Sequence, residues 1–281
     1  MKIVPWVNKT ITPKPNGRSS DFISASYIWG CNGGCKNYCY VYRNQKQTVN
    51  VATNLDQIEA AAAKLANKLP LHKPPNQISQ NGLYYLDIGC NSDVALYSKR
   101  IELERILKFY DNNLKLNTTF ATKYSKLLTL DVNHFNKKPR VRVSLMPERL
   151  ATVLESGCTP VPERITDIKR LQSLGWEVQI NFSPVVLYNN WQRDYNELFK
   201  IIANQDIDVP CEVIMLTGSV APNIPEFEHN YLLSNEFQEE KITKYGSKAK
   251  RYNYHMKKGA IENFKTIYSK YWDVKNIRYI F

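Results

Sequence analysis

The sequence predicts an α/β fold built from parallel βα units. Runs rich in aromatic and β-branched residues, which are typical of buried strands, alternate with runs that have apolar residues at helical spacing. This alternation continues through the middle of the chain without an internal repeat or a low-complexity segment. Strands that alternate with helices in this way are typical of a parallel sheet covered by helices.

The expected elements follow in chain order. An alanine-rich helix over 53–69 opens with Thr53 and Asn54, which are suitable capping residues. The first expected strand, over 82–89, is bounded by glycines, and a later helix ends at Gly175. Further strands are expected over 118–122, 140–144, 176–183 and 211–216, and further helices over 96–112, 163–174 and 191–204.

Polar residues follow the expected strands directly. In a barrel of βα units, active residues lie where strands end and loops begin. Polar residues also follow strands simply because turns require them, so their position alone is weak evidence of function. The residues concerned are Cys90, Ser92, Lys123, Ser144, Ser183 and Thr217.

The composition indicates a soluble protein with a polyanionic partner. The 281 residues are 43% hydrophobic and 23% charged, and we find neither a signal peptide nor an apolar run that could span a membrane. We therefore expect a cytoplasmic protein without a membrane partner, whose six cysteines are thiols or metal ligands. The formal net charge of +12 favours nucleic acid or a phosphorylated ligand, although it could also serve solubility.

The basic charge is concentrated near the C-terminus. Residues 241–258 hold seven basic residues and no acidic one, with tyrosines between them. Basic side chains can neutralise phosphates while aromatic faces stack on bases. A solvated segment that contacts nothing is the alternative. The candidate nucleic-acid contacts are Tyr245, Lys248, Lys250, Arg251 and Tyr252.

The strongest local signal is a loop with three cysteines within nine residues, Cys31, Cys35 and Cys39. Two glycines, Gly33 and Gly34, allow the backbone to fold back so that the sulfurs can face one centre. A structural zinc site requires four protein ligands, and no other cysteine or histidine is near in the sequence. Three thiolates suit an iron–sulfur cluster with one open iron. Zinc and unrelated thiols remain as alternatives.

A three-cysteine loop near the N-terminus of a βα barrel resembles the radical S-adenosylmethionine (SAM) superfamily. The resemblance implies a partial (β/α)6 TIM barrel over residues 1–225, with residues 226–281 as a basic, DNA-contacting extension packed on it. It also implies a [4Fe–4S] cluster whose open iron is chelated by SAM, which an electron splits to give a 5′-deoxyadenosyl radical. The spacing departs from the commonest pattern, because both gaps between the cysteines hold three residues.

Further segments resemble the spore photoproduct lyase family, which repairs a methylene-bridged thymine dimer in DNA. Their order and spacing cover about residues 25 to 260. The segments are Tyr38-Cys39-Tyr40, Gly89-Cys90-Asn91-Ser92-Asp93, Thr122-Lys123-Tyr124, Arg142-Val143-Ser144, Ser183-Pro184 followed by Trp191, and Tyr245-Gly246.

The resemblance implies roles for individual residues. Cys90 falls on the thiol that gives a hydrogen atom to the product radical, although a small buried residue is the alternative. Tyr38 and Tyr40 fall on tyrosines that help to return hydrogen to SAM, and Tyr38 also lies over the adenine. Positions that contact SAM are Ser92, Lys123, Ser144 and Ser183. A reductase such as flavodoxin or ferredoxin is the implied electron donor. Cys158 and Cys211 are interpreted as structural.

Two other functions are weighed against repair of a thymine lesion. The segment before Cys31 is short, which favours a divergent relative. Such a relative could modify thymine-derived or other nucleic-acid bases, for example in the hypermodified DNA of a bacteriophage. The third hypothesis is a non-enzymatic nucleic-acid-binding module with a metal cluster. It leaves the βα body and the Cys90 segment unexplained.

Overall fold

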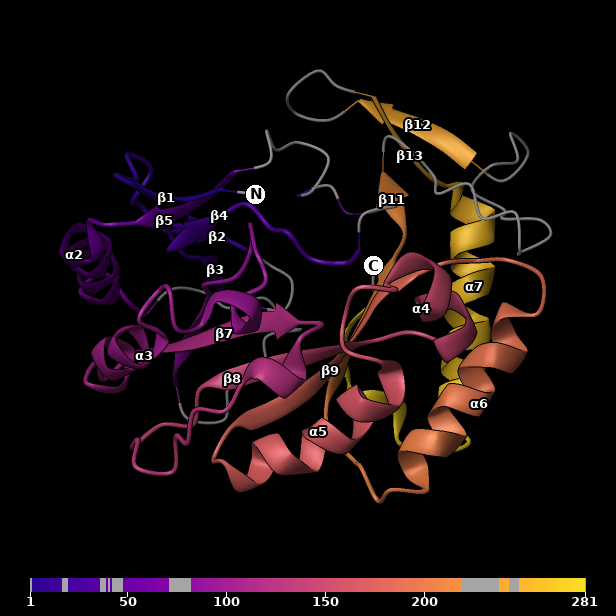
Figure 1. Cartoon of the computed structure of the whole chain (residues 1–281). Helices are drawn as coiled ribbons and strands as arrows, with labels where there is room; N and C mark the ends of the chain where they lie inside the picture. Colours follow the sequence, from indigo (N-terminus) through magenta and orange to yellow (C-terminus); the bar gives the residue numbers. More distant parts are fainter. Residues whose placement is uncertain are drawn as a thin grey trace.

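The computed structural model describes residues 2–16, 20–35, 39, 41, 48–70, 82–218, 238–242 and 248–280. Its centre is an eight-stranded sheet in the order β14-β10-β9-β8-β7-β6-β3-β2 (Figure 1). All neighbouring strands from β3 to β14 are parallel, and only the edge strand β2 runs antiparallel to β3. The sheet curls into a partial barrel, so the predicted α/β barrel is confirmed.

Five strands of the barrel, β6 to β10, agree closely with the expected ones, whereas β2, β3 and β14 were not expected. Because neighbours are parallel, their carboxyl ends lie at one end of the sheet. The bounds are β2 (Lys14–Pro15), β3 (Phe22–Ile23), β6 (Tyr84–Asp87), β7 (Leu116–Thr122), β8 (Arg140–Leu145), β9 (Glu177–Val185), β10 (Cys211–Met215) and β14 (Ile277–Ile280).

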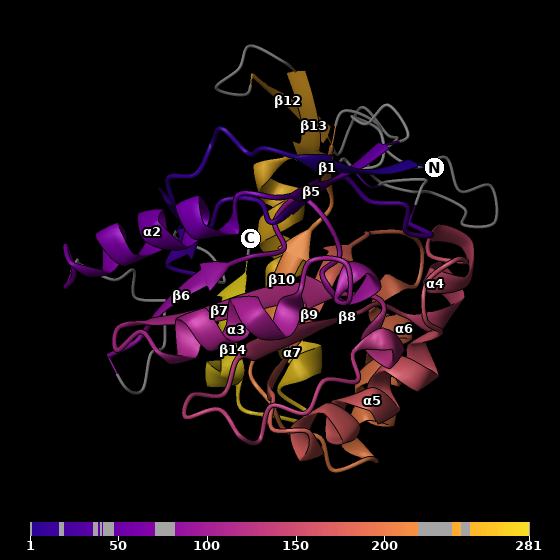
Figure 2. The same ribbon diagram turned by 60° about the vertical axis from the view of Figure 1, so that its left-hand side comes forward.

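Helices cover the outer face of the curled sheet (Figures 1 and 2). The expected helix over 96–112 is broken into a 3-10 turn at Ala95–Tyr97 and α3, because Glu102 has a φ of 53°. A left-handed residue cannot continue a right-handed helix. The helix α4 was not expected. The bounds are α2 (Leu55–Ala66), α3 (Leu103–Asp111), α4 (Glu148–Leu154), α5 (Val161–Ser173), α6 (Trp191–Ala203) and α7 (Tyr254–Tyr268).

The C-terminal segment completes the barrel. Phe264 of α7 packs edge-to-face on Phe182 of β9 and Phe199 of α6, with ring centroids 5.7 and 5.3 Å away. The following strand β14 pairs with β10. Residues 254–280, which lie beyond the expected boundary at 225/226, therefore supply a helix and a strand of the main sheet.

Two small sheets lie at the carboxyl end of the barrel (Figure 1). One contains β1 (Lys2–Trp6), β5 (Thr48–Ala52) and β4 (Ile28–Trp29) in the order β1-β5-β4. The other is antiparallel, with β13 (Lys248–Tyr252) between β11 (Thr217–Gly218) and β12 (Gln238–Ile242). Within the described ranges, no helix has the length and apolarity needed to cross a bilayer.

Phe264→Ala should lower the free energy of unfolding by about 3–5 kcal/mol, because it removes a buried ring at the junction of α6, α7 and β9. Chemical denaturation measures the change. The matched control is Tyr254→Ala on the same helix, where the side chain is 67% exposed and the change should stay within about 0.5 kcal/mol. Equal, small effects of both substitutions would show that α7 is not part of the barrel core.

Candidate active site at the carboxyl end of the barrel

The carboxyl ends of the strands surround a cavity of about 550 Å³. Its walls bring together residues that are far apart in the sequence, from the cysteine loop and from the ends of β6, β7, β8 and β9. Eight of the residues that the sequence singled out line it: Cys31, Cys35, Cys39, Cys90, Ser92, Lys123, Ser144 and Ser183.

Hydrogen bonds from the loop backbone fix the cysteine loop beside this cavity. The Asn32 amide donates to the hydroxyl of Tyr97 at 2.8 Å, and the Gly34 amide donates to the hydroxyl of Tyr124 at 2.6 Å. The Tyr124 hydroxyl in turn donates to the carbonyl of Gly157 at 3.0 Å. Both tyrosines follow barrel strands, so the loop is attached to the barrel through its backbone.

Two further features set the position of the loop. A Cβ on Gly34 would lie 2.2 Å from the Cα of Gly157, so only glycine permits this approach of two backbones. At the start of the loop, the Ser92 hydroxyl donates to the Gly30 carbonyl at 2.6 Å, and the Gly30 amide donates to the Asn91 carbonyl at 3.0 Å. Ser92 therefore holds the loop as well as lining the cavity.

The three loop thiols lie along one wall. The Cys39 amide donates to the Cys35 carbonyl at 3.2 Å, and the Cys35 thiol is hydrogen-bonded to the thiols of Cys39 and Cys158. Burial, with the nearby Asp93 carboxylate, raises the pKa of Cys31 to about 11. Among the described side chains, no three Cys, His, Asp or Glu converge as ligands of a single metal ion. A cluster of several irons separates its thiolates more widely than one ion does.

A buried ion network forms the floor of the cavity. Arg142 of β8 donates from Nη1 to Glu212 of β10 and from Nη2 to Asp87 of β6, both at 2.8 Å. All three side chains are nearly inaccessible to solvent. Sequence reasoning missed this network. The available signal was an ionisable residue inside each of three buried strands, which requires a partner.

Lys123 places a second charge near the mouth. Its ammonium lies 3.4 Å from the Ser183 carbonyl and 3.6 Å from Glu155, which also pairs with Arg164 at 2.6 Å. Burial alone would lower the pKa of Lys123, but Glu155 and the Cys35 thiol outweigh it and raise the pKa, so the ammonium stays charged.

Asp93, the last residue of the segment that begins at Gly89, joins two strand ends. It accepts hydrogen bonds from the Thr122 hydroxyl at 2.7 Å and from the Lys123 amide at 2.8 Å. Burial raises its pKa above the ordinary range. Asn181 of β9 has a buried Oδ1 that accepts no hydrogen bond within the described structure. Because Asn181 lines the cavity, this oxygen suits a donor on a bound ligand.

The structure alters the interpretation of two residues, Tyr252 and Cys158. Tyr252 is 2% exposed and its hydroxyl accepts a hydrogen bond from the Leu187 amide, so its ring belongs to the core and has no free face for a base. Cys158, interpreted as structural, lies against the Cys35 thiol of the cysteine loop, and this hydrogen bond lowers the pKa of Cys158. Cys211 is buried in β10 away from the cavity wall.

The remaining predicted residues are only partly described. Tyr38, Tyr40 and Tyr245 lie outside the described residues. Lys248 and Lys250 are placed by their backbone in β13, and Arg251 of the same strand is half-buried.

Tyr124→Phe should reduce the iron and sulfide retained after anaerobic reconstitution, because the loop loses the hydroxyl that fixes Gly34 and Gly157. Tyr188→Phe is the matched control, since its hydroxyl donates to Asp194 on α6, away from the loop. Thermal melting of the iron-free proteins checks that both variants fold. Full iron retention in Tyr124→Phe would show that the hydroxyl does not position the loop.

Comparison with known proteins connects this site with one family. Residues 3–281 match the family model described as spore photoproduct lyase. The chain is 26% identical over 199 residues to the spore photoproduct lyase of Clostridium acetobutylicum, covering 68% of this chain and 56% of that protein. It is also 26% identical over 180 residues to that of a Geobacillus species, covering 63% and 49%. The chain thus spans about half the length of these curated relatives.

Solved structures of spore photoproduct lyase share the fold. A double mutant with bound AdoMet and dinucleoside spore photoproduct has a TM-score of 0.82, with 20% identity over 99% of this chain and 81% of that one. The protein complexed with dinucleoside spore photoproduct has the same TM-score, identity and coverage. At this identity the structures establish the fold alone, whereas the family model matches nearly the whole sequence. The chain therefore belongs to the spore photoproduct lyase family.

Proposed function

We propose that this chain is a radical SAM enzyme that repairs spore photoproduct, a thymine lesion in DNA. The observation that carries the proposal is that one cavity at the carboxyl end of the barrel gathers the three loop cysteines, Cys90 and the four polar residues expected to contact SAM. Family membership supports it, as do the relatives named spore photoproduct lyase.

The donor set fits the expected cofactors. Cys31, Cys35 and Cys39 would hold a [4Fe–4S] cluster and leave one iron for the amino and carboxylate groups of SAM. When bound, the cluster and SAM supply a primary carbon radical that can take a hydrogen atom from an unactivated C–H bond. The Oδ1 of Asn181, buried and without a described partner, supports a polar ligand in this cavity.

Side chains at the strand ends would orient SAM. The Lys123 ammonium, held beside the Ser183 carbonyl, can bind a carboxylate. Ser144 lies deeper, where its hydroxyl accepts a hydrogen bond from Asn181 Nδ2 at 3.2 Å. Ser92 completes the proposed contacts from the loop after β6. The lining is buried at Ser144, Asn181 and the Arg142 network, whereas Cys35, Cys90 and Lys123 are partly exposed.

Cys90 is the proposed hydrogen-atom donor. It follows β6 directly, is half-buried and lines the cavity, so its thiol can reach a base in the barrel. The S–H bond is weaker than the C–H bond that it would form, which makes transfer to a carbon radical favourable. The hydrogen atom moves from sulfur to carbon and leaves the unpaired electron on sulfur. Tyr38 and Tyr40 are proposed to return hydrogen towards SAM.

The basic strand β13 is the proposed contact with the DNA backbone. It lies beyond the carboxyl end of the barrel and contributes Lys248, Lys250 and Arg251, but not Tyr252 (Figure 1). A base in duplex DNA would have to leave the stack to reach the cavity. We also propose a cytoplasmic location and a reductase such as flavodoxin or ferredoxin as electron donor.

The direct test is anaerobic turnover. The reconstituted protein is given dithionite, SAM and DNA that contains spore photoproduct, and thymine and 5′-deoxyadenosine are quantified together. Thymine formation is the expected result. Deoxyadenosine without thymine would direct the search to modification of another base. If neither product forms, the result contradicts a radical SAM function.

Cys90→Ala should keep its cluster and its ability to cleave SAM but form adducts in place of clean thymine, because the product radical has lost its hydrogen donor. Product chromatography with mass spectrometry measures the distribution. Cys211→Ala is the matched control, because Cys211 is a buried thiol outside the cavity. An unchanged product distribution in Cys90→Ala would make Cys90 a structural residue.

A further inference from the structure

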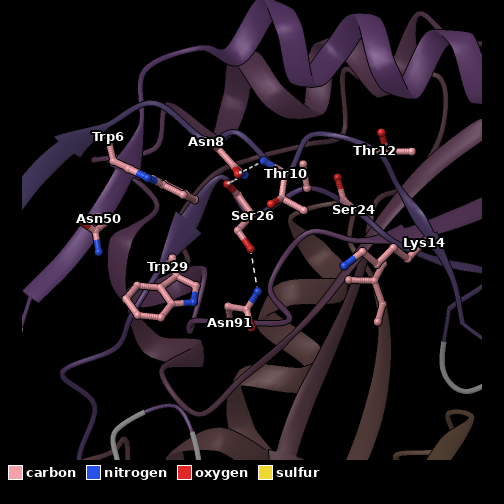
Figure 3. A pocket seen from close by; sticks show the side chains of 12 residues that line it. Trp6, Asn8, Thr10, Thr12, Lys14, Ser24, Ser26, Trp29, Asn50 and Asn91 are labelled. Carbon is pink, nitrogen blue, oxygen red and sulfur yellow. Dashed lines mark hydrogen bonds between the residues drawn. The ribbon is translucent and has the colours of Figure 1, made fainter. Parts of the chain in front are cut away.

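One face of the small sheet β1-β5-β4 carries two tryptophans on either side of an asparagine. Trp29 of β4 is paired with Asn50 of β5, and Trp6 of β1 is paired with Ala52, two residues further along β5. Because alternate residues of a strand share a face, Trp6, Asn50 and Trp29 lie on the same side of the sheet. Figure 3 shows the two indoles and the amide directed into one hollow.

This hollow is a pocket of about 420 Å³ with aromatic and polar walls. Trp29 is 39% exposed, and the side chain of Asn50 makes no hydrogen bond with another described residue. Among the described residues of the lining, Lys14 is the only charged one. The neighbouring Lys2 and Lys9 are exposed, and residues 2–16 include no carboxylate. The pocket therefore offers aromatic faces, an amide and positive charge together.

The pocket adjoins the barrel cavity. Ile23 at the end of β3 lines both. Asn91 lines the pocket and donates from Nδ2 to the Ser26 hydroxyl at 2.6 Å, while its chain neighbours Cys90 and Ser92 line the barrel cavity (Figure 3). A strand of nucleic acid with one base in the barrel thus has this pocket beside it.

We propose that the pocket binds one nucleobase, from a nucleotide next to the one that enters the barrel. Indole faces stack on bases, amides hydrogen-bond with base edges, and lysine neutralises a phosphate. Aromatic side chains on an open sheet face are a recurrent platform for single-stranded nucleic acid. An apolar partner would instead leave the Asn50 amide buried without a hydrogen bond. The inference rests on the proposed action on nucleic acid and deepens it.

The test compares two ligands on the anaerobically reconstituted holoprotein by calorimetry: dinucleoside spore photoproduct, and a thymidine oligonucleotide of about six residues that contains the same lesion, within the site sizes of single-strand binders. Trp29→Ala should weaken binding of the oligonucleotide about tenfold, in line with the loss of one stacked base. Affinity for the dinucleoside, which has no neighbouring base to place in the pocket, should not change.

Variants separate stacking from folding. Trp29→Tyr should retain most of the affinity for the oligonucleotide, because it keeps an aromatic face. Asn50→Ala should lower that affinity several-fold. The matched control is Leu114→Ala, a 93% exposed residue between α3 and β7 at the opposite end of the barrel, which should change neither affinity. Thermal melting confirms that each variant is folded.

Each outcome has a distinct meaning. Equal oligonucleotide affinities for the wild type, Trp29→Ala and Asn50→Ala would overturn the nucleobase pocket and leave the proposed function standing. A wild-type protein that binds neither ligand would overturn the proposed function itself, and the pocket with it. Weaker binding of both ligands in Trp29→Ala alone would assign Trp29 to the barrel site and would also overturn a separate pocket.

Discussion

Two tyrosine hydroxyls hold the cysteine loop over the barrel, and the rest of the site depends on that attachment. Tyr97 and Tyr124 accept hydrogen bonds from the amides of Asn32 and Gly34. Each hydroxyl belongs to the barrel, so the backbone of the loop takes its position from residues that follow the strands. The absence of a side chain at Gly34 then permits its contact with Gly157.

Buried ion pairs hold charged side chains in fixed positions inside the barrel. Arg142 bridges Asp87 and Glu212, and Arg164 with Lys123 surrounds Glu155. Buried ion pairs add little net stability compared with apolar packing, because desolvation offsets the attraction. Their position around a polar cavity gives them another use, since they hold fixed charges where a zwitterionic ligand such as SAM would lie. The proposed nucleobase pocket adjoins this cavity and would bind a neighbouring nucleotide.

The sequence predicted the barrel well because buried parallel strands leave strong local patterns. The cysteine loop was clear for a similar reason, since close thiols have few structural uses. Features that depend on a single backbone conformation or on contacts between distant residues were harder to predict from the sequence. The break at Glu102 depends on one left-handed residue, and the role of α7 in the core depends on packing of Phe264. Tyr252 was misassigned because composition was considered without strand alternation, which places Arg251 and Tyr252 on opposite faces of β13.

Three thiolates of the loop are proposed to bind a cluster and to leave one iron open to SAM. Cys158 provides the sharpest challenge, because this fourth thiol is hydrogen-bonded to Cys35. The most direct measurement is the electron paramagnetic resonance spectrum of the dithionite-reduced protein before and after addition of SAM. The proposed site predicts a changed spectrum in both the wild type and Cys158→Ala. A wild-type spectrum that SAM leaves unchanged, with a response only in Cys158→Ala, would contradict the claim and identify Cys158 as a fourth ligand.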